Sequence, residues 1–186
     1  MIPSLIAFSG KARNGKTEGA RAIQALHPQF VILSFATPLK RMAMEQFGLT
    51  MEDLENKERV VDLGRRQTTV RQLLIDIGKM YRAIDSDFWV KRLWKDVEAS
   101  VVHGHNHIVI DDMRFLNEAT FLKEHGAKLI RVSRPGMKLI DDISETELDD
   151  YSGFDARMLN DGSLDDYHSN VAIVLDTLEI GSPAAK

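Results

Sequence analysis

Short apolar runs separated by segments of helical periodicity are the dominant pattern along this chain. Runs that predict buried strands occur at residues 5–8, 30–35, 107–110, 128–133 and 156–159. The segments between them predict helices from their apolar spacing and end signals, at residues 15–26, 37–47, 70–84, 86–97, 116–125 and 164–178. This alternation predicts an α/β fold of three layers, in which helices cover both faces of a mainly parallel, five-stranded sheet.

The stretch between the second and third strands is predicted to be almost wholly helical. Thr37-Pro38 is typical of an N-cap followed by proline at the first helical position. Thr50 with Asp53, and Thr69 with Gln72, have the spacing of capping boxes, in which side chains satisfy the unpaired N–H groups at a helix start. We therefore expect a helix to begin at each of these places.

The chain is expected to form a single domain of residues 1–186 with two additions to its sheet, and its length suits one full hydrophobic core. Residues 38–100, approximately, are predicted to be a helical insertion at the C-terminal edge of the sheet. Residues 135–155, approximately, are acidic and weakly periodic, and they predict a short lid.

A glycine-rich turn joins the first strand to the first helix and satisfies the pattern G-x-x-x-x-G-K-[ST]. The two glycines let the loop curl so that its N–H groups face inward, and the following helix adds its positive end to the same anion site. In such a P-loop the lysine reaches the terminal phosphates and the hydroxyl ligates magnesium. The pattern predicts that ATP is bound by Gly10, Lys11, Ala12, Arg13, Asn14, Gly15, Lys16 and Thr17.

The third strand ends in two carboxylates, Asp111 and Asp112. Ligands of open α/β sheets bind at the C-terminal ends of the strands, so an acid there is expected to complete a magnesium site with Thr17. The sequence leaves open which of the two aspartates does so.

Four arginines are placed where they can serve a phosphorylated acceptor. Arg114 and Arg134 follow the third and fourth strands, and Arg71 and Arg82 lie in the helical insertion. Like charges a few ångströms apart cost about 4 kcal/mol per pair at intermediate dielectric, so an anionic acceptor beside a polyphosphate requires several cations. The arginines therefore favour a kinase.

Composition narrows the class of partner. Hydrophobic residues make up 44% and charged residues 28% of the chain, and there is no cysteine for disulfides or thiolate zinc sites. The N-terminal MIPSLIAFSG lacks the features of a signal peptide, and no apolar stretch is long enough for a membrane span. With a net charge of −4 and no basic stripe, we expect a cytoplasmic protein that binds free nucleotides and neither nucleic acid nor membrane.

Other P-loop proteins remain as alternatives. Guanine-specific switches use Asn-Lys-x-Asp, and the nearest string here, Asn56-Lys57-Glu58-Arg59, lacks the aspartate. A nucleotide-binding switch thus stays open as an alternative, together with a kinase of another phosphorylated metabolite, of the phosphomevalonate or dephospho-coenzyme A type.

Several blocks of residues, in order, resemble the phage-type deoxynucleoside monophosphate kinases, a family within the P-loop nucleotide kinases. Together they span most of the chain. The blocks are the P-loop, Phe35-Ala36-Thr37-Pro38-Leu39-Lys40, Val70-Arg71-Gln72-Leu73-Leu74 through Gly78 to Asp87-Phe88-Trp89-Val90, Asp112-Met113-Arg114, Gly126-Ala127-Lys128 through Arg134-Pro135-Gly136, and Asn160-Asp161-Gly162-Ser163-Leu164.

The resemblance implies that the γ-phosphoryl group of ATP is transferred, with Mg²⁺, to a deoxynucleoside monophosphate. It implies catalytic roles for Lys16, Arg114 and Arg134, and contacts with adenine for Asn160 and Asp161. An encoding phage would place the protein in the host cytoplasm, and a homodimer is compatible with the resemblance. The implied acceptor site consists of Lys40, Arg71, Arg82, Trp89, Asp112 and Arg114.

Overall fold

The computed structural model describes residues 4–137 and 142–180, and the chain divides into two compact units. Unit 1 contains the described residues up to Ser34 and from Lys95 onward, and unit 2 is Phe35–Trp94. Within the described residues, no helix has the length and apolar character needed to cross a membrane.

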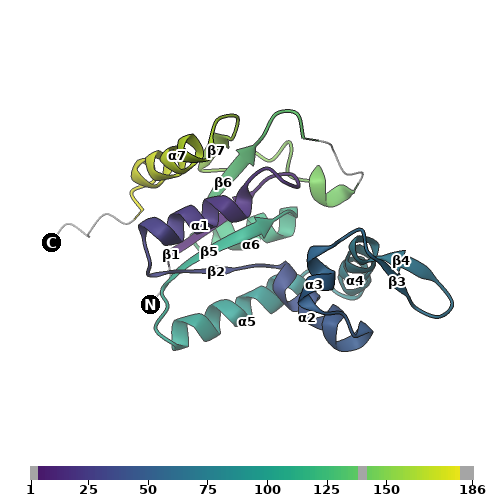
Figure 1. The fold of residues 1–186 in the computed structure, drawn as a ribbon. Coiled ribbons are helices and arrows are strands. Elements are labelled where there is room, and N and C mark those ends of the chain that lie inside the picture. The colour runs from purple at the N-terminus through teal and green to yellow at the C-terminus, as the bar shows by residue number, and fades with distance from the viewer. Residues whose placement is uncertain (1–3, 138–141, 181–186) are drawn as a thin grey trace. The chain divides into compact units, whose positions relative to one another are not determined.

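Five parallel strands form the sheet of unit 1 (Figure 1). In sheet order they are β2 (Phe30–Leu33), β5 (His107–Met113), β1 (Ser4–Ser9), β6 (Lys128–Ser133) and β7 (Ala156–Leu159). The inner strands are buried on both faces, which explains why their sequences are continuous apolar runs and do not alternate. The five predicted strands are thereby confirmed.

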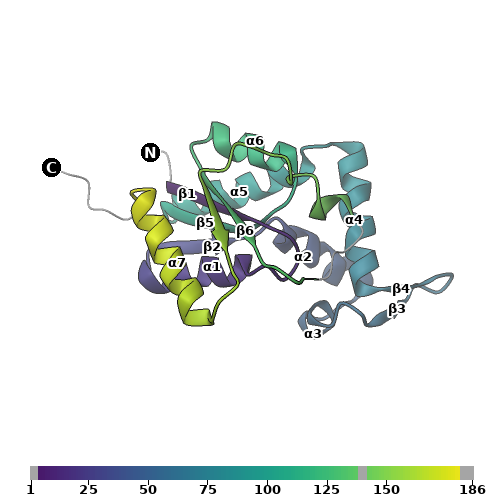
Figure 2. The ribbon, with the colours of Figure 1, turned by 90° about the horizontal axis from the view of Figure 1, so that it is seen from above.

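Helices lie on both sides of this sheet (Figure 2). On one side are α1 (Lys16–Leu26) and α7 (Leu164–Thr177). On the other are α6 (Leu116–Glu124) and the part of α5 (Phe88–Val102) that belongs to unit 1. The core under α1 and α7 includes the buried side chains Ile6, Phe8, Ile23, Val132 and Val171. The predicted three-layer α/β fold is confirmed.

Unit 2 contains α2 (Ala36–Phe47), α3 (Met51–Glu55), α4 (Val70–Ile84), the first part of α5, and a hairpin of two short antiparallel strands, β3 (Val60–Asp62) and β4 (Gln67–Thr69). The capping box of Thr50 and Asp53 is present, and the Thr69 hydroxyl accepts a hydrogen bond from the Gln72 amide. The predicted helix starts at α3 and α4 are therefore confirmed.

Two predictions for unit 2 are wrong. Helix α2 begins at Ala36 with Phe35 at the N-cap position, so Thr37-Pro38 lies inside its first turn. The first N–H groups of a helix have no partner within it, and proline is tolerated there without marking the start. The stretch, predicted to be almost wholly helical, also contains the hairpin β3–β4. The hairpin was missed because three residues per strand are too few to show a period of two.

The predicted lid has little regular structure where the structure describes it. Residues 138–141 of this segment lie outside the described residues, and the remainder contains the short 3₁₀ helix η1 (Ile143–Glu145). The C-terminal end of the predicted lid is held by Asp155, which accepts hydrogen bonds from Nζ of Lys123 at 2.6 Å and from the Leu129 amide at 2.8 Å. Partial burial opposes ionisation, but these two donors hold the pKa of Asp155 below its ordinary value.

Candidate functional site

The P-loop links β1 to α1, and close contacts require glycine at two of its positions. A Cβ on Gly10 would lie 2.5 Å from the carbonyl oxygen of Val132. Gly15 has a φ of 105°, and a Cβ there would lie 2.6 Å from Nδ2 of Asn160. Arg13 has a φ of 63°, a left-handed conformation that is uncommon outside glycine and is found at ligand-binding sites. The turn therefore has the tightly curled backbone that the pattern predicts.

Lys16 is folded back onto this loop. Its exposed fraction is 7%, and Nζ donates to the carbonyl oxygens of Gly10 at 2.6 Å and Lys11 at 2.8 Å. Burial, together with the nearby cation of Arg114, lowers the pKa of Lys16 from 10.5 to about 8. A phosphate group would add negative charge beside this poorly hydrated ammonium and stabilise its charged form.

The two aspartates of β5 point in different directions. The strand extends to Met113, so Asp111 and Asp112 lie within it and alternate between the faces of the sheet. Oγ1 of Thr17 donates to Oδ2 of Asp111 at 2.7 Å, whereas Oδ2 of Asp112 accepts from Oγ of Ser34 at 2.6 Å. The structure thus brings Asp111, and not Asp112, to the P-loop threonine.

Arg114 and the P-loop meet at a carboxylate that the sequence did not predict. Glu145 of η1 is only 5% exposed, and its Oε2 accepts a hydrogen bond from the Ala12 amide at 2.6 Å. Its Oε1 forms an ion pair with Nη1 of Arg114. Glu145 lies in a weakly periodic acidic segment, and its local sequence gives no indication that it contacts the P-loop.

A second acid of the same segment reaches the P-loop. Asp149 pairs with Nζ of Lys11 at 2.9 Å and with the guanidinium of Arg131. Arg131 also donates to Oγ of Ser9 at 2.9 Å, at the end of β1. Arg134, which follows β6, is exposed, and the described contacts do not bring it to this cluster.

Asn160 and Tyr167 brace the P-loop through its backbone. Nδ2 of Asn160 donates to the carbonyl oxygen of Asn14 at 2.9 Å, and the hydroxyl of Tyr167 donates to the carbonyl oxygen of Gly15 at 3.0 Å. Burial raises the pKa of Tyr167, which keeps this donor protonated. Asp161 is exposed. The implied adenine contacts stay a prediction, while the bracing contact of Asn160 is a feature that the sequence did not reveal.

In unit 2, Arg71 is held by an acid that can release it easily. Its Nε and Nη2 donate to Oε1 of Glu58 at 2.9 Å and 2.7 Å, and the Glu58 side chain is 72% exposed. Exposed ion pairs contribute little free energy, so an incoming phosphate can replace this carboxylate at small cost. Lys40 on α2 and Arg82 on α4 are half-buried.

Trp89 belongs to the core of unit 2. It is 2% exposed, its Nε1 donates to the carbonyl oxygen of Gly78 at 3.1 Å, and its ring packs against Tyr81 and Phe88. In this arrangement the indole supports the junction of α4 and α5 and offers no open face to an acceptor base.

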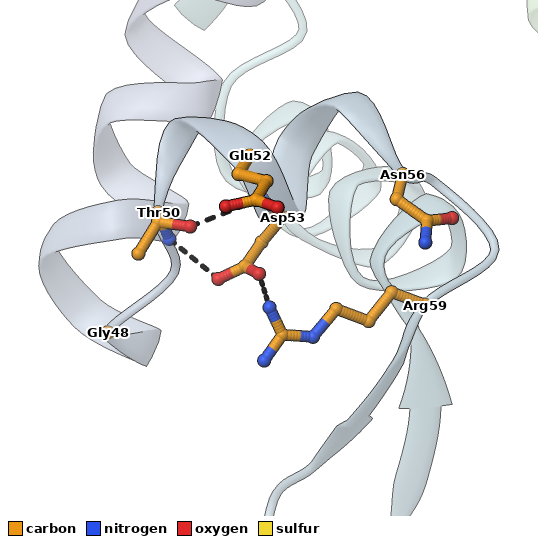
Figure 3. A pocket seen from close by; sticks show the side chains of 6 residues that line it. All are labelled: Gly48, Thr50, Glu52, Asp53, Asn56 and Arg59. Carbon is orange, nitrogen blue, oxygen red and sulfur yellow. Dashed lines mark hydrogen bonds and ion pairs between the residues drawn. The ribbon is translucent and has the colours of Figure 1, made fainter.

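Unit 2 also has a polar hollow of about 420 Å³ beside α3 (Figure 3). The buried carboxylate of Asp53 accepts from the Thr50 amide and pairs with the Arg59 guanidinium. These groups satisfy one another as parts of a helix start, so the hollow needs no ligand to explain them. Its lining residues are Gly48, Thr50, Glu52, Asp53, Asn56 and Arg59.

Comparison with solved structures shows the fold. A dephospho-CoA kinase from Campylobacter jejuni has a TM-score of 0.54 at 14% identity, with 94% of this chain and 96% of that chain covered. A sugar kinase from Janibacter sp. HTCC2649 has a TM-score of 0.53 at 12% identity and 99% coverage of both chains. Both similarities confirm the P-loop kinase fold.

Comparison of sequences shows the family. A putative deoxynucleotide monophosphate kinase of Acanthamoeba polyphaga mimivirus is 29% identical over 187 residues, covering 92% of this chain and 96% of that protein. The deoxynucleotide monophosphate kinase of Enterobacteria phage T4 is 31% identical over 115 residues, covering 60% of this chain and 47% of that protein. The family model for deoxynucleotide monophosphate kinase matches residues 49–171, more than half of the chain. The chain therefore belongs to the deoxynucleotide monophosphate kinase family.

Proposed function

We propose that this chain transfers the γ-phosphoryl group of ATP to a deoxynucleoside monophosphate, giving ADP and the deoxynucleoside diphosphate. Family membership supports this activity. In the structure, the observation that carries it is that the P-loop amide of Ala12 and the guanidinium of Arg114 hold one carboxylate between them. Donors that converge on one anion are what an enzyme needs to stabilise a phosphoryl group in transit.

The residues act by positioning and by neutralising charge. The P-loop amides and Lys16 hold the phosphates of ATP, and Arg114 neutralises charge on the phosphoryl group as it moves. An oxygen of the acceptor phosphate forms a bond to the γ-phosphorus while the bond from that phosphorus to the β–γ bridging oxygen breaks. The electron pair leaves with ADP, so no protein nucleophile takes part.

Magnesium fits the residues at the P-loop threonine. The Thr17 hydroxyl and the Asp111 carboxylate are hard oxygen donors 2.7 Å apart, and Mg²⁺ is usually bound by one or two such groups together with phosphates and water. When bound, the ion would neutralise negative charge on the phosphates. Asp112, which holds Ser34, is proposed to support the end of β2 and not to bind the metal.

The acceptor is proposed to bind through cations of unit 2. Arg71 and Arg82 would hold its monophosphate, and Lys40 would add positive charge at α2. Arg71 supports this proposal because its present partner is an exposed glutamate that a phosphate can replace. Arg134 is proposed to contact the phosphoryl group once nucleotides are bound. The net charge of −4 favours free nucleotides over nucleic acid as substrates.

A panel of acceptors tests this function. The protein is incubated with γ-labelled ATP and each of the four common deoxynucleoside monophosphates, their ribose counterparts and dephospho-coenzyme A. We expect label in one or more deoxynucleoside diphosphates. Label only in the product from dephospho-coenzyme A, or only in inorganic phosphate, would show that the acceptor has been assigned wrongly.

A further inference from the structure

Glu145 occupies groups that a phosphate would use. Its carboxylate is buried, with one oxygen on the Ala12 amide and the other on the Arg114 guanidinium. The ammonium of Lys16 lies close enough for Glu145 to affect its pKa, and Glu145 acts to raise it. One carboxylate is thus set among an amide of the P-loop and two cations of unit 1.

A phosphate and this carboxylate cannot hold the same donors together. Both are anions, and like charges repel strongly at short range where water is largely excluded. Each donor has a limited number of N–H groups aimed at the site, and an ionised carboxylate accepts charge-assisted hydrogen bonds as a phosphate does. Binding of the phosphates of ATP therefore requires Glu145 to withdraw.

We infer that Glu145 is a positioning residue that serves as an internal substitute for phosphate, holding Arg114 and the Ala12 amide in place until the nucleotide replaces it. This inference rests on the proposed function, because it assumes that ATP is the incoming anion. The exchange keeps the partly buried donors and the buried carboxylate satisfied before ATP arrives, which avoids the cost of unpaired polar groups. In return, ATP binds more weakly than it would to a vacant site.

The exchange also links the described part of the acidic segment to the nucleotide. Asp149, four residues after Glu145, pairs with Lys11 of the same P-loop. Arrival of phosphate at the loop competes with both acids at once. Release of η1 is then a direct consequence of ATP binding, and Arg114 changes partner from a carboxylate of the protein to the phosphate.

The variant Glu145→Gln tests this inference. The glutamine oxygen can still accept from the Ala12 amide, but the charge that competes with phosphate is gone. We expect ATP, titrated by calorimetry, to bind roughly tenfold more tightly than to the wild type, as suits the loss of one charge-assisted competitor. In a background carrying Arg114→Ala, the same substitution should improve ATP binding less, because half of the competition is already absent.

Glu147→Gln is the matched control. Glu147 lies in the same segment and has the same charge, but it accepts from the Leu116 amide at 2.8 Å and is exposed. We expect its ATP affinity to stay within about twofold of the wild type, as is usual for exposed charges. If ATP affinity rose equally in both variants, the change in net charge alone would explain the rise, and the inference would be overturned.

Thermal unfolding separates a structural role from a positioning role. If Glu145 only stabilises the fold, Glu145→Gln should lower both the melting temperature and the affinity for ATP. ATP binding that is unchanged or weaker in this variant overturns the inference. Failure of the proposed function looks different, because the wild type would then bind no ATP or transfer no label in the acceptor panel.

Discussion

Replacing Lys16 by methionine is expected to slow phosphoryl transfer by a large factor without weakening the fold. Methionine has a similar length and no charge, and it removes the contacts from Nζ to the carbonyl oxygens of Gly10 and Lys11. The site would keep its other groups, including Arg114 and the P-loop amides. The substitution therefore separates the contribution of this one cation to catalysis from its effect on stability.

The magnitude for stability follows from the burial of Lys16. Its pKa, lowered from 10.5 to about 8, corresponds to a penalty of roughly 3 kcal/mol for the charged form in the folded protein. An unfolded chain would not impose that penalty, so at pH 7 the charge lowers the free energy of unfolding. The two hydrogen bonds to loop carbonyls, worth about 1 kcal/mol each, offset part of it. We expect the free energy of unfolding of the variant to be at least that of the wild type, and at most about 1 kcal/mol higher.

The magnitude for catalysis follows from the charge that is lost. One pair of unit charges at close range is worth about 4 kcal/mol at intermediate dielectric. If the transition state loses most of this interaction energy, turnover falls by about a hundred- to a thousandfold.

The assay combines transfer of label from γ-labelled ATP with thermal unfolding, and Lys128→Met is the control. Lys128 is a lysine of β6 whose side chain is 47% exposed and whose Nζ lies 3.8 Å from Oδ1 of Asp155. The control should keep both turnover and melting temperature. Turnover of Lys16→Met close to the wild type would refute the role assigned to this lysine. A melting temperature lower by more than about 5 °C would refute the reasoning from burial.

Three further predictions concern other contacts of unit 1. Arg114→Ala should lower kcat/KM for the acceptor about a hundredfold or more and change ATP affinity far less. Arg157 is an exposed arginine on β7, and the control Arg157→Ala should match the wild type. Equal losses of kcat/KM in the two variants would remove Arg114 from the site. Tyr167→Phe removes the hydrogen bond to the Gly15 carbonyl, so the melting temperature should fall by a few degrees and ATP should bind several-fold more weakly; calorimetry and thermal unfolding that show no change would contradict the bracing role. Asp155→Asn should lower the free energy of unfolding by about 1 kcal/mol at pH 7. Because the folded pKa of Asp155 is depressed, its contribution is present above the ordinary value of 3.8 and is lost as the pH falls through the folded pKa, so the two proteins should converge in acid.

Much of unit 1 was predictable because its determinants are local. Strands β6 and β7 have the bounds that their apolar runs predict, and the P-loop is fixed by glycines within one short turn. The hairpin of unit 2 was missed because its strands are too short to show a period and its turn is rich in charge. The start of α2 was misplaced because proline is tolerated at several positions of a first turn.

By itself, the sequence determined the class of fold, the anion-binding loop and several of the residues that lie near it. Only the tertiary structure decided which residues meet in the site, including some that the sequence did not single out. Asp111 and Asp112 are equivalent in the sequence, and the alternation of β5 between the faces of the sheet separates them. Glu145 meets Ala12 across 133 positions of chain, and Asn160 meets Asn14 across 146. Contacts of this kind depend on how helices and strands pack, and a local pattern carries no information about them.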